Sequence, residues 1–178
     1  MNVAYANGKK YNKSNKLREG RSDMELIFYT EENQRQINSY NLTEEQLRYT
    51  GHPIECVELG KENTNRYSIL GMEKDKLVTF FCLHKNEGVR PYSNNRNAIL
   101  LRAFSTDTYF QGKGYAKQAL ILLPNFVKEN FKDINEIVLA VNIQNEVAQE
   151  LYKKYGFKDE GLRTMGKKGE LIIMSYYL

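Results

Sequence analysis

The chain has 178 residues, 41% of them hydrophobic, which suffices for one domain with a buried core but not for two domains of ordinary size. Its formal charge of +4 does not indicate an acidic partner, because residues 1–23 hold six basic and two acidic residues and the remainder is neutral. No stretch approaches the roughly 20 apolar residues that span a bilayer, and residues 1–23 lack the apolar segment of a secretory signal, so we expect a cytoplasmic protein without a membrane partner.

Residues 1–23 are rich in Gly, Asn and Lys, and we assign them no structure. We interpret them as a disordered basic leader, a remnant of an expression vector or the product of an upstream misread start. A short arm that binds nucleic acid or a membrane is the sharper alternative, but charged termini are usually solvated tails. We therefore place a single domain at residues 24–178 and expect no nucleic-acid partner.

The chain is poor in cysteine and histidine. Its two cysteines, Cys56 and Cys82, and its two histidines are widely scattered, which does not match a zinc site. Cys82 lies in the apolar run "KLVTFFCL", where a free thiol acts as a small hydrophobic group. We expect no metal.

Runs of β-branched and aromatic residues alternate with polar segments in the first half of the domain. Thr43 followed by Glu44 and Glu45 is typical of a helix start. In chain order, we expect a strand at 24–30, helices at 31–40 and 43–49, and strands at 66–72, 76–84 and 98–105. Charged or Asn/Gly-rich turns separate the last three strands, which predicts an antiparallel meander.

The pattern changes after residue 105. We expect a helix at about 113–130, a strand at 136–141, a helix at 146–155, and strands at about 157–161 and 170–178. Strands followed by helix–strand–helix crossovers indicate an α/β fold, in which a mixed sheet is covered by helices on both faces.

The segment "DTYFQGKGYAKQAL" places Gly112 and Gly114 immediately before the long helix. The first N–H groups of a helix have no intrahelical partner, and with the helix dipole they bind anions. Glycine lacks a Cβ that would block the approach of such an anion, and Lys113 adds a positive charge. The spacing matches neither a Walker loop nor a dinucleotide fingerprint. Behind the loop, we expect Ala116, Ala119, Leu120, Leu123 and Val127 to form the buried face of the helix.

The next helix is bounded by Asn145, a natural N-cap, and by Gly156, which fits the left-handed position after the last turn. We expect its apolar face to consist of Val147, Ala148, Leu151 and Tyr155, with Phe157 folding back onto it. Tyr152 borders that face. From the pattern alone, we expect a half-buried ring with its hydroxyl in water.

Together, the two segments resemble the GCN5-related N-acetyltransferases (GNAT family), in which they occur in this order and spacing. Gln111-x-x-Gly114-x-Ala116 matches the signature Q/R-x-x-G-x-G/A, and the stretch from Asn145 to Phe157 matches the second motif. The likeness covers residues 24–178, although the first 75 of these match only in outline. It implies six to seven strands, two central parallel strands that splay apart, and about four helices on both faces.

The resemblance also implies acetyl-CoA as the cofactor, with its pyrophosphate on the amides of residues 111–116. The implied cofactor-binding residues are Phe104, Ser105, Thr106, Gln111, Gly112, Lys113, Gly114, Tyr115, Ala116, Asn145 and Tyr152. Two of them have implied catalytic roles: a backbone N–H near Ser105 stabilises the oxyanion, and Tyr152 protonates the departing thiolate.

The implied activity is direct transfer of an acetyl group to a primary amine of a small molecule or a protein, by a monomer or a homodimer. Some relatives carry a glutamate base where this chain has Ala140. The other candidates for the general base are Glu58, Asp107, His84 and a chain of water molecules. We assign the role to none of them. The alternative is a noncatalytic coenzyme A sensor or interaction domain, which only Ala140 supports. We expect residues 31–60 and the final strands to select the acceptor.

Overall fold

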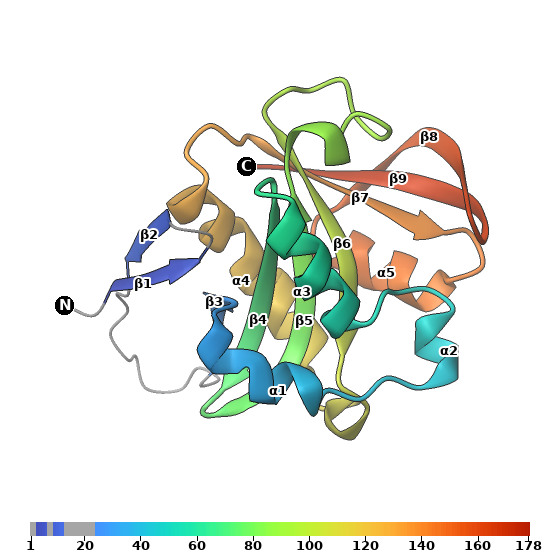
Figure 1. Cartoon of the computed structure of the whole chain (residues 1–178). Helices are drawn as coiled ribbons and strands as arrows, with labels where there is room; N and C mark the ends of the chain where they lie inside the picture. The colour runs from blue at the N-terminus through green and yellow to red at the C-terminus, as the bar shows by residue number, and fades with distance from the viewer. Residues whose placement is uncertain (1–2, 7–8, 13–23) are drawn as a thin grey trace.

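The computed structural model describes residues 3–6, 9–12 and 24–178, and its main body is a seven-stranded sheet with helices on both faces (Figure 1). In spatial order the strands are β3 (Met24–Phe28), β4 (Arg66–Glu73), β5 (Lys76–His84), β6 (Ala98–Thr106), β7 (Glu136–Asn142), β9 (Gly169–Tyr177) and β8 (Lys158–Gly166). Strands β6 and β7 are parallel, and the other neighbours are antiparallel. This confirms the predicted mixed sheet and its meander.

The first part of the chain contains a separate two-stranded sheet. Strand β1 (Val3–Ala6) pairs antiparallel with β2 (Lys9–Asn12), a pairing that the sequence analysis did not predict. The other residues of the predicted leader lie outside the described residues. The division of the chain at Met24 therefore stays a prediction.

The helices lie on both faces of the large sheet. They are α1 (Gln34–Asn38), α2 (Glu44–Leu47), α3 (Pro53–Glu62), α4 (Tyr115–Asn130) and α5 (Glu146–Lys154), with 3-10 turns η1 (Glu31–Asn33), η2 (Asn86–Gly88) and η3 (Thr108–Phe110). Helices α1 and α3 share one hydrophobic cluster with the sheet, whereas α4 and α5 share another on the opposite face (Figure 1). Among the described residues, no helix has the length and apolar character needed to cross a membrane.

Helix α3 was not predicted, although its start carries a recognisable signal. The ring of His52 accepts a hydrogen bond from the N–H of Ile54, and Pro53 occupies the first turn, where its missing N–H costs nothing. The start of α2, in contrast, is as predicted. Thr43 Oγ1 accepts from the N–H of Gln46, 3.2 Å away, and the Gln46 side chain accepts from the N–H of Thr43.

The two parallel strands separate towards their carboxyl ends. They pair only from Ala98 to Leu101 on β6 and from Glu136 to Leu139 on β7. Beyond these residues β6 pairs only with β5, and β7 only with β9. We call the two separated ends, residues 102–106 of β6 and 140–142 of β7, the fork. The fork confirms the predicted splay of the two central strands.

A β-bulge accompanies the fork. Phe80 lies opposite Ser105 and Cys82 lies opposite Arg102, so one residue of β5 faces two residues of β6. At the bulge, Ala103 has a φ of 53°, which is uncommon for a residue other than glycine. Since a bulge bends the strand that contains it, this irregularity turns the end of β6 away from β7.

Candidate active site

The loop before α4 has the conformation that glycine favours. Gly112 has a φ of 72°, and Gly114, the N-cap of α4, has a φ of 83°. A Cβ added at either position would meet no atom within 4 Å, so both glycines border open space. The two glycines therefore allow the turn and leave its outer side accessible.

The backbone N–H groups from Gly112 to Ala116 have no hydrogen-bond partner among the described residues. The first bond at this end of the helix joins the N–H of Gln118 to the carbonyl of Gly114, at 3.1 Å. Several donors are therefore available where the helix dipole is positive. This geometry fits an anion such as a pyrophosphate.

Two predicted loop residues use their side chains to brace the turn. Lys113 Nζ donates to the carbonyl of Tyr109 at 3.0 Å and lies 5.1 Å from the centre of the Phe110 ring. The hydroxyl of Tyr115 donates to the carboxylate of Glu73, and this bond raises the pKa of Tyr115. Ala116 was expected to be the first buried residue of α4, but it is only half-buried. The first buried residue of the helix is instead Tyr115.

The end of β6 is tied to residues that the sequence analysis did not identify. Ser105 is buried, and its Oγ lies 3.0 Å from the hydroxyl of Tyr40. Burial raises the pKa of Tyr40 well above its ordinary value, so this hydroxyl stays protonated. The carbonyl of Thr106 accepts a hydrogen bond from Gln46 Nε2 at 2.7 Å. These contacts hold the strand end against the segment around α2.

Tyr152 is more buried than expected. It is 9% exposed, and its ring lies 6.1 Å from that of Phe104 and 5.7 Å from that of Phe157. Its hydroxyl has no hydrogen-bond partner among the described residues, and burial raises its pKa. The structure thus places Tyr152 beside Phe104 of the fork with an unengaged donor.

The ends of α5 are as predicted, and so is most of its apolar face, because Ala148, Leu151 and Tyr155 pack against the core. Asn145 Oδ1 accepts from the N–H of Ala148 at 3.2 Å, and Gly156 has a φ of 93°. Val147, predicted to be buried, is 85% exposed. Gln149 is buried instead, because its amide donates to the carbonyls at the end of β7, at 3.1 and 2.8 Å. The apolar pattern could not reveal this polar anchor.

The three side chains considered as bases are engaged elsewhere. Both carboxylate oxygens of Asp107 accept backbone N–H groups, from Asn41 and Tyr109, each at 2.8 Å. Glu58 pairs with an exposed lysine on α3. His84 lies opposite Leu100, five residues from Ser105 along β6 and therefore roughly 16 Å away. Burial lowers its pKa, and its Nε2 lies 3.0 Å from a carboxylate.

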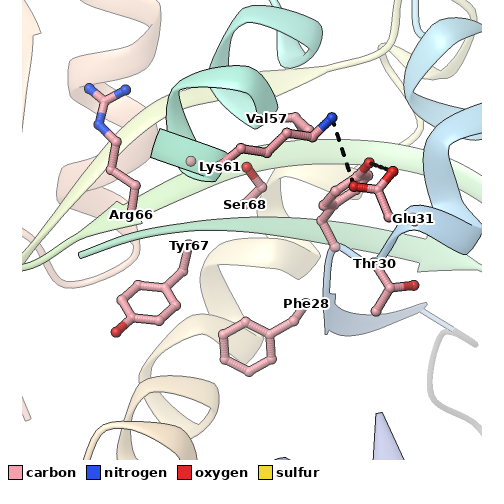
Figure 2. Close-up of a pocket in the computed structure, with 10 residues that line it drawn as sticks. Phe28, Thr30, Glu31, Val57, Lys61, Arg66, Tyr67 and Ser68 are labelled. Carbon is pink, nitrogen blue, oxygen red and sulfur yellow. Dashed lines mark hydrogen bonds and ion pairs between the residues drawn. The ribbon is translucent and has the colours of Figure 1, made fainter. Parts of the chain in front are cut away.

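A small cavity lies away from the fork, between β3, β4 and α3 (Figure 2). Its volume is about 110 Å³, and Lys61 Nζ lies 3.8 Å from Glu31 Oε1 at its edge. The lining residues are Phe28, Tyr29, Thr30, Glu31, Val57, Gly60, Lys61, Arg66, Tyr67 and Ser68. None of the predicted site residues lines this cavity. It lies at the β3 edge of the sheet, and β5 and β6 separate its strands from β7.

Comparisons with known proteins agree with this geometry. The chain matches the model of the acetyltransferase (GNAT) family over residues 24–157. It is 40% identical over 157 residues to the uncharacterized N-acetyltransferase YbbJ of Bacillus subtilis (strain 168), covering 88% of this chain and 98% of that protein. It is 26% identical over 132 residues to the spermine/spermidine N(1)-acetyltransferase of the same strain, covering 74% and 86%.

Two solved structures share the fold. AAC(6')-Ib in complex with ribostamycin and coenzyme A has a TM-score of 0.71 at 13% identity, covering 87% of this chain and 93% of that chain. Spermidine N-acetyltransferase from Vibrio cholerae in complex with CoA and spermine has a TM-score of 0.65 at 19% identity, covering 88% and 96%. At these identities the likeness shows the fold alone.

Proposed function

Because this chain belongs to the acetyltransferase (GNAT) family, we propose that it acetylates a primary amine of a small molecule at the fork. Family membership makes it an acetyl-CoA-dependent N-acetyltransferase and disfavours the noncatalytic alternative. The small-molecule acceptor is supported by the relative named spermine/spermidine N(1)-acetyltransferase. The identity of the amine acceptor and the roles of individual residues are our proposals.

The loop before α4 is the proposed pyrophosphate site. The observation that carries this assignment is the set of unpartnered N–H groups from Gly112 to Ala116, beside two glycines that border open space. Main-chain donors at a helix start bind a diphosphate without any specific side chain. The end of β6 has no partner strand on the β7 side, so its backbone would hold the pantetheine arm in the fork. Asn145, at the start of α5, would border the cofactor from the other side.

The amine attacks the thioester carbonyl, and a fixed donor stabilises the charge that develops on the oxygen. We assign this role to a backbone N–H of β6 near Ser105. The contacts of Ser105 with Tyr40 and of Thr106 with Gln46 hold this strand end in place, so little reorganisation is needed as the charge develops.

Tyr152 is proposed to assist the departing thiolate. A thiol has a pKa near 8.5 and a tyrosine a pKa near 10, so complete proton transfer is uphill by about 2 kcal/mol. Burial raises the pKa of Tyr152 further and makes complete transfer still less favourable. We therefore assign Tyr152 a hydrogen bond to the thiolate, for which its unengaged hydroxyl is suited.

The amine must lose a proton before it attacks. For a lysine-like amine this costs about 4.6 kcal/mol at pH 7, against about 1 kcal/mol for a terminal α-amine. Since Asp107, Glu58 and His84 are engaged elsewhere, we propose that the proton leaves through water. The rate should therefore rise with pH for amines of high pKa.

A thiol-release assay tests this function directly. The protein is mixed with acetyl-CoA and a panel of amines that includes spermine, spermidine, lysine and a lysine-containing peptide. Thiol release and the mass of the acetylated product are then measured. We expect turnover with at least one small amine, and calorimetry should detect binding of coenzyme A. Binding without turnover on any amine would instead favour a noncatalytic coenzyme A sensor.

A further inference from the structure

Three hydrogen bonds link the two ends of the fork through α2 and the turn between β8 and β9. The carbonyl of Thr106 accepts from Gln46 Nε2 at 2.7 Å. Leu47 follows Gln46 in α2, and its carbonyl accepts from Lys168 Nζ at 2.7 Å. The carbonyl of Lys168 accepts from Asn142 Nδ2 at 2.8 Å. We call this connection from β6 to β7 the bridge.

The bridge and the loop before α4 lie on different sides of the fork. Tyr40 and Leu42, which precede α2, pack in the cluster that contains α1 and α3. Helix α4 packs on the opposite face of the sheet. If the pyrophosphate binds at the start of α4, the pantetheine arm approaches from that side. The amine must then reach the thioester from the side of the bridge.

We propose that Lys168 and Gln46 are positioning residues for the amine acceptor, and that the bridge sets the spacing of the two fork ends where the amine enters. This inference rests on the proposed function. Gln46 acts on β6 through Thr106, and Lys168 links the same helix to β7.

The orientation of the Gln46 amide is determined by its surroundings. Its Oε1 accepts from the N–H of Thr43 at 3.0 Å and from the hydroxyl of Thr108 at 3.1 Å. Nε2 is therefore directed to Thr106. The backbone N–H of Thr108 donates to the carbonyl of Asn41 at 2.9 Å, so this side of the fork is firmly connected to the segment before α2.

Lys168 lies on an exposed turn, yet both its side-chain ammonium and its backbone carbonyl form hydrogen bonds. Its ammonium satisfies a carbonyl of the last turn of α2, which a helix leaves without an internal partner. Its neighbour Lys167 is also exposed, and its side chain makes no hydrogen bond or ion pair with the described residues. Lys167 therefore provides a control with the same charge on the same turn.

The first test compares Lys168→Met, Lys168→Arg and Lys167→Met in steady-state assays with acetyl-CoA and spermine. We expect Lys168→Met to raise the KM for spermine at least fivefold and to change the KM for acetyl-CoA less than twofold. Lys168→Arg should restore the KM for spermine to within twofold of the original. Removing a positive charge alone would favour a polycation, so charge loss cannot explain the rise. Equal effects of Lys168→Met and Lys167→Met would overturn the proposal.

The second test asks whether Gln46 and Lys168 act as one connection. Gln46→Glu keeps the oxygen that accepts from Thr43 and Thr108 but removes the donor to Thr106. If the bridge is a single link, the double variant Gln46→Glu/Lys168→Met should raise the KM for spermine no further than the more severe single variant. Multiplied fold-changes would show independent effects and contradict the bridge.

Hydrogen exchange separates this inference from the proposed function, because it needs no turnover. With coenzyme A bound, Lys168→Met should speed amide exchange at residues 47–50 at least fivefold, and Lys168→Arg should restore slow exchange. Unchanged exchange in Lys168→Met would refute the bridge even in an active enzyme. Absence of turnover in the unaltered protein would refute the proposed function instead.

Discussion

Replacing Tyr152 by phenylalanine should lower turnover roughly 10- to 150-fold without weakening the fold. A hydrogen bond to a charged group contributes about 1.5–3 kcal/mol, and each 1.36 kcal/mol corresponds to a tenfold change in rate. The Tyr152 hydroxyl has no partner among the described residues, so its removal breaks no hydrogen bond in the free protein. The ring keeps its contacts with Phe104 and Phe157. We therefore expect the free energy of unfolding to change by less than about 0.5 kcal/mol.

The assay is thiol release at saturating acetyl-CoA, combined with calorimetry of coenzyme A binding and a urea titration. Tyr155→Phe is the matched control, because Tyr155 follows the same helix and is half-buried against the same cluster. The control should retain its rate, and both variants should bind coenzyme A with little change. An unchanged turnover in Tyr152→Phe would show that Tyr152 does not stabilise the departing thiolate by a hydrogen bond. A lower rate accompanied by lost stability would indicate a structural role.

Three further changes probe the loop, the fork and the pH dependence. Gly114→Ala should weaken coenzyme A binding at least fivefold in calorimetry, because its methyl enters the open space and a left-handed φ of 83° costs alanine about 1 kcal/mol. Tyr40→Phe should lower the free energy of unfolding by about 1–2 kcal/mol in urea, since it leaves the buried Ser105 hydroxyl without its partner. Burial lowers the pKa of His84, so the unfolded chain binds a proton more readily and stability should fall from about pH 7.5 to 5.5. His84→Gln should flatten this decrease, whereas Glu87, with a pKa of about 2, acts only at lower pH.

Much of the fold was predictable because its signals are local. Runs of β-branched and aromatic residues marked the strands of the sheet, and N-cap residues such as Thr43 and Asn145 marked helix starts at the observed positions. Gly112 and Gly114 identified the loop because their left-handed φ values restrict the choice of residue. Helix α3 was missed because its ten residues, Pro53–Glu62, show only weak amphipathic patterning.

Apolar periodicity predicted the buried side of α5 only in part: Ala148, Leu151 and Tyr155 pack against the core as expected, but two positions differ. Val147 fits the apolar pattern but is exposed, whereas Gln149 breaks it and is buried. The decisive contacts are backbone carbonyls at the end of β7, six and seven residues earlier in the chain. A polar side chain turns inward when such carbonyls satisfy its donors, and hydropathy alone does not register this.

The order of residues was enough to reveal most of the strands and helices of residues 24–178, the glycine-containing loop before α4 and the family motifs, since each depends on neighbours a few positions apart. Contacts between distant positions appeared only once the chain was folded. Gln46 meets Thr106 sixty residues later, and Lys168 meets Leu47 across 121 residues. No local pattern encodes these pairs, because they arise from the bulge, the separation of β6 and β7, and the packing of α2 beside them.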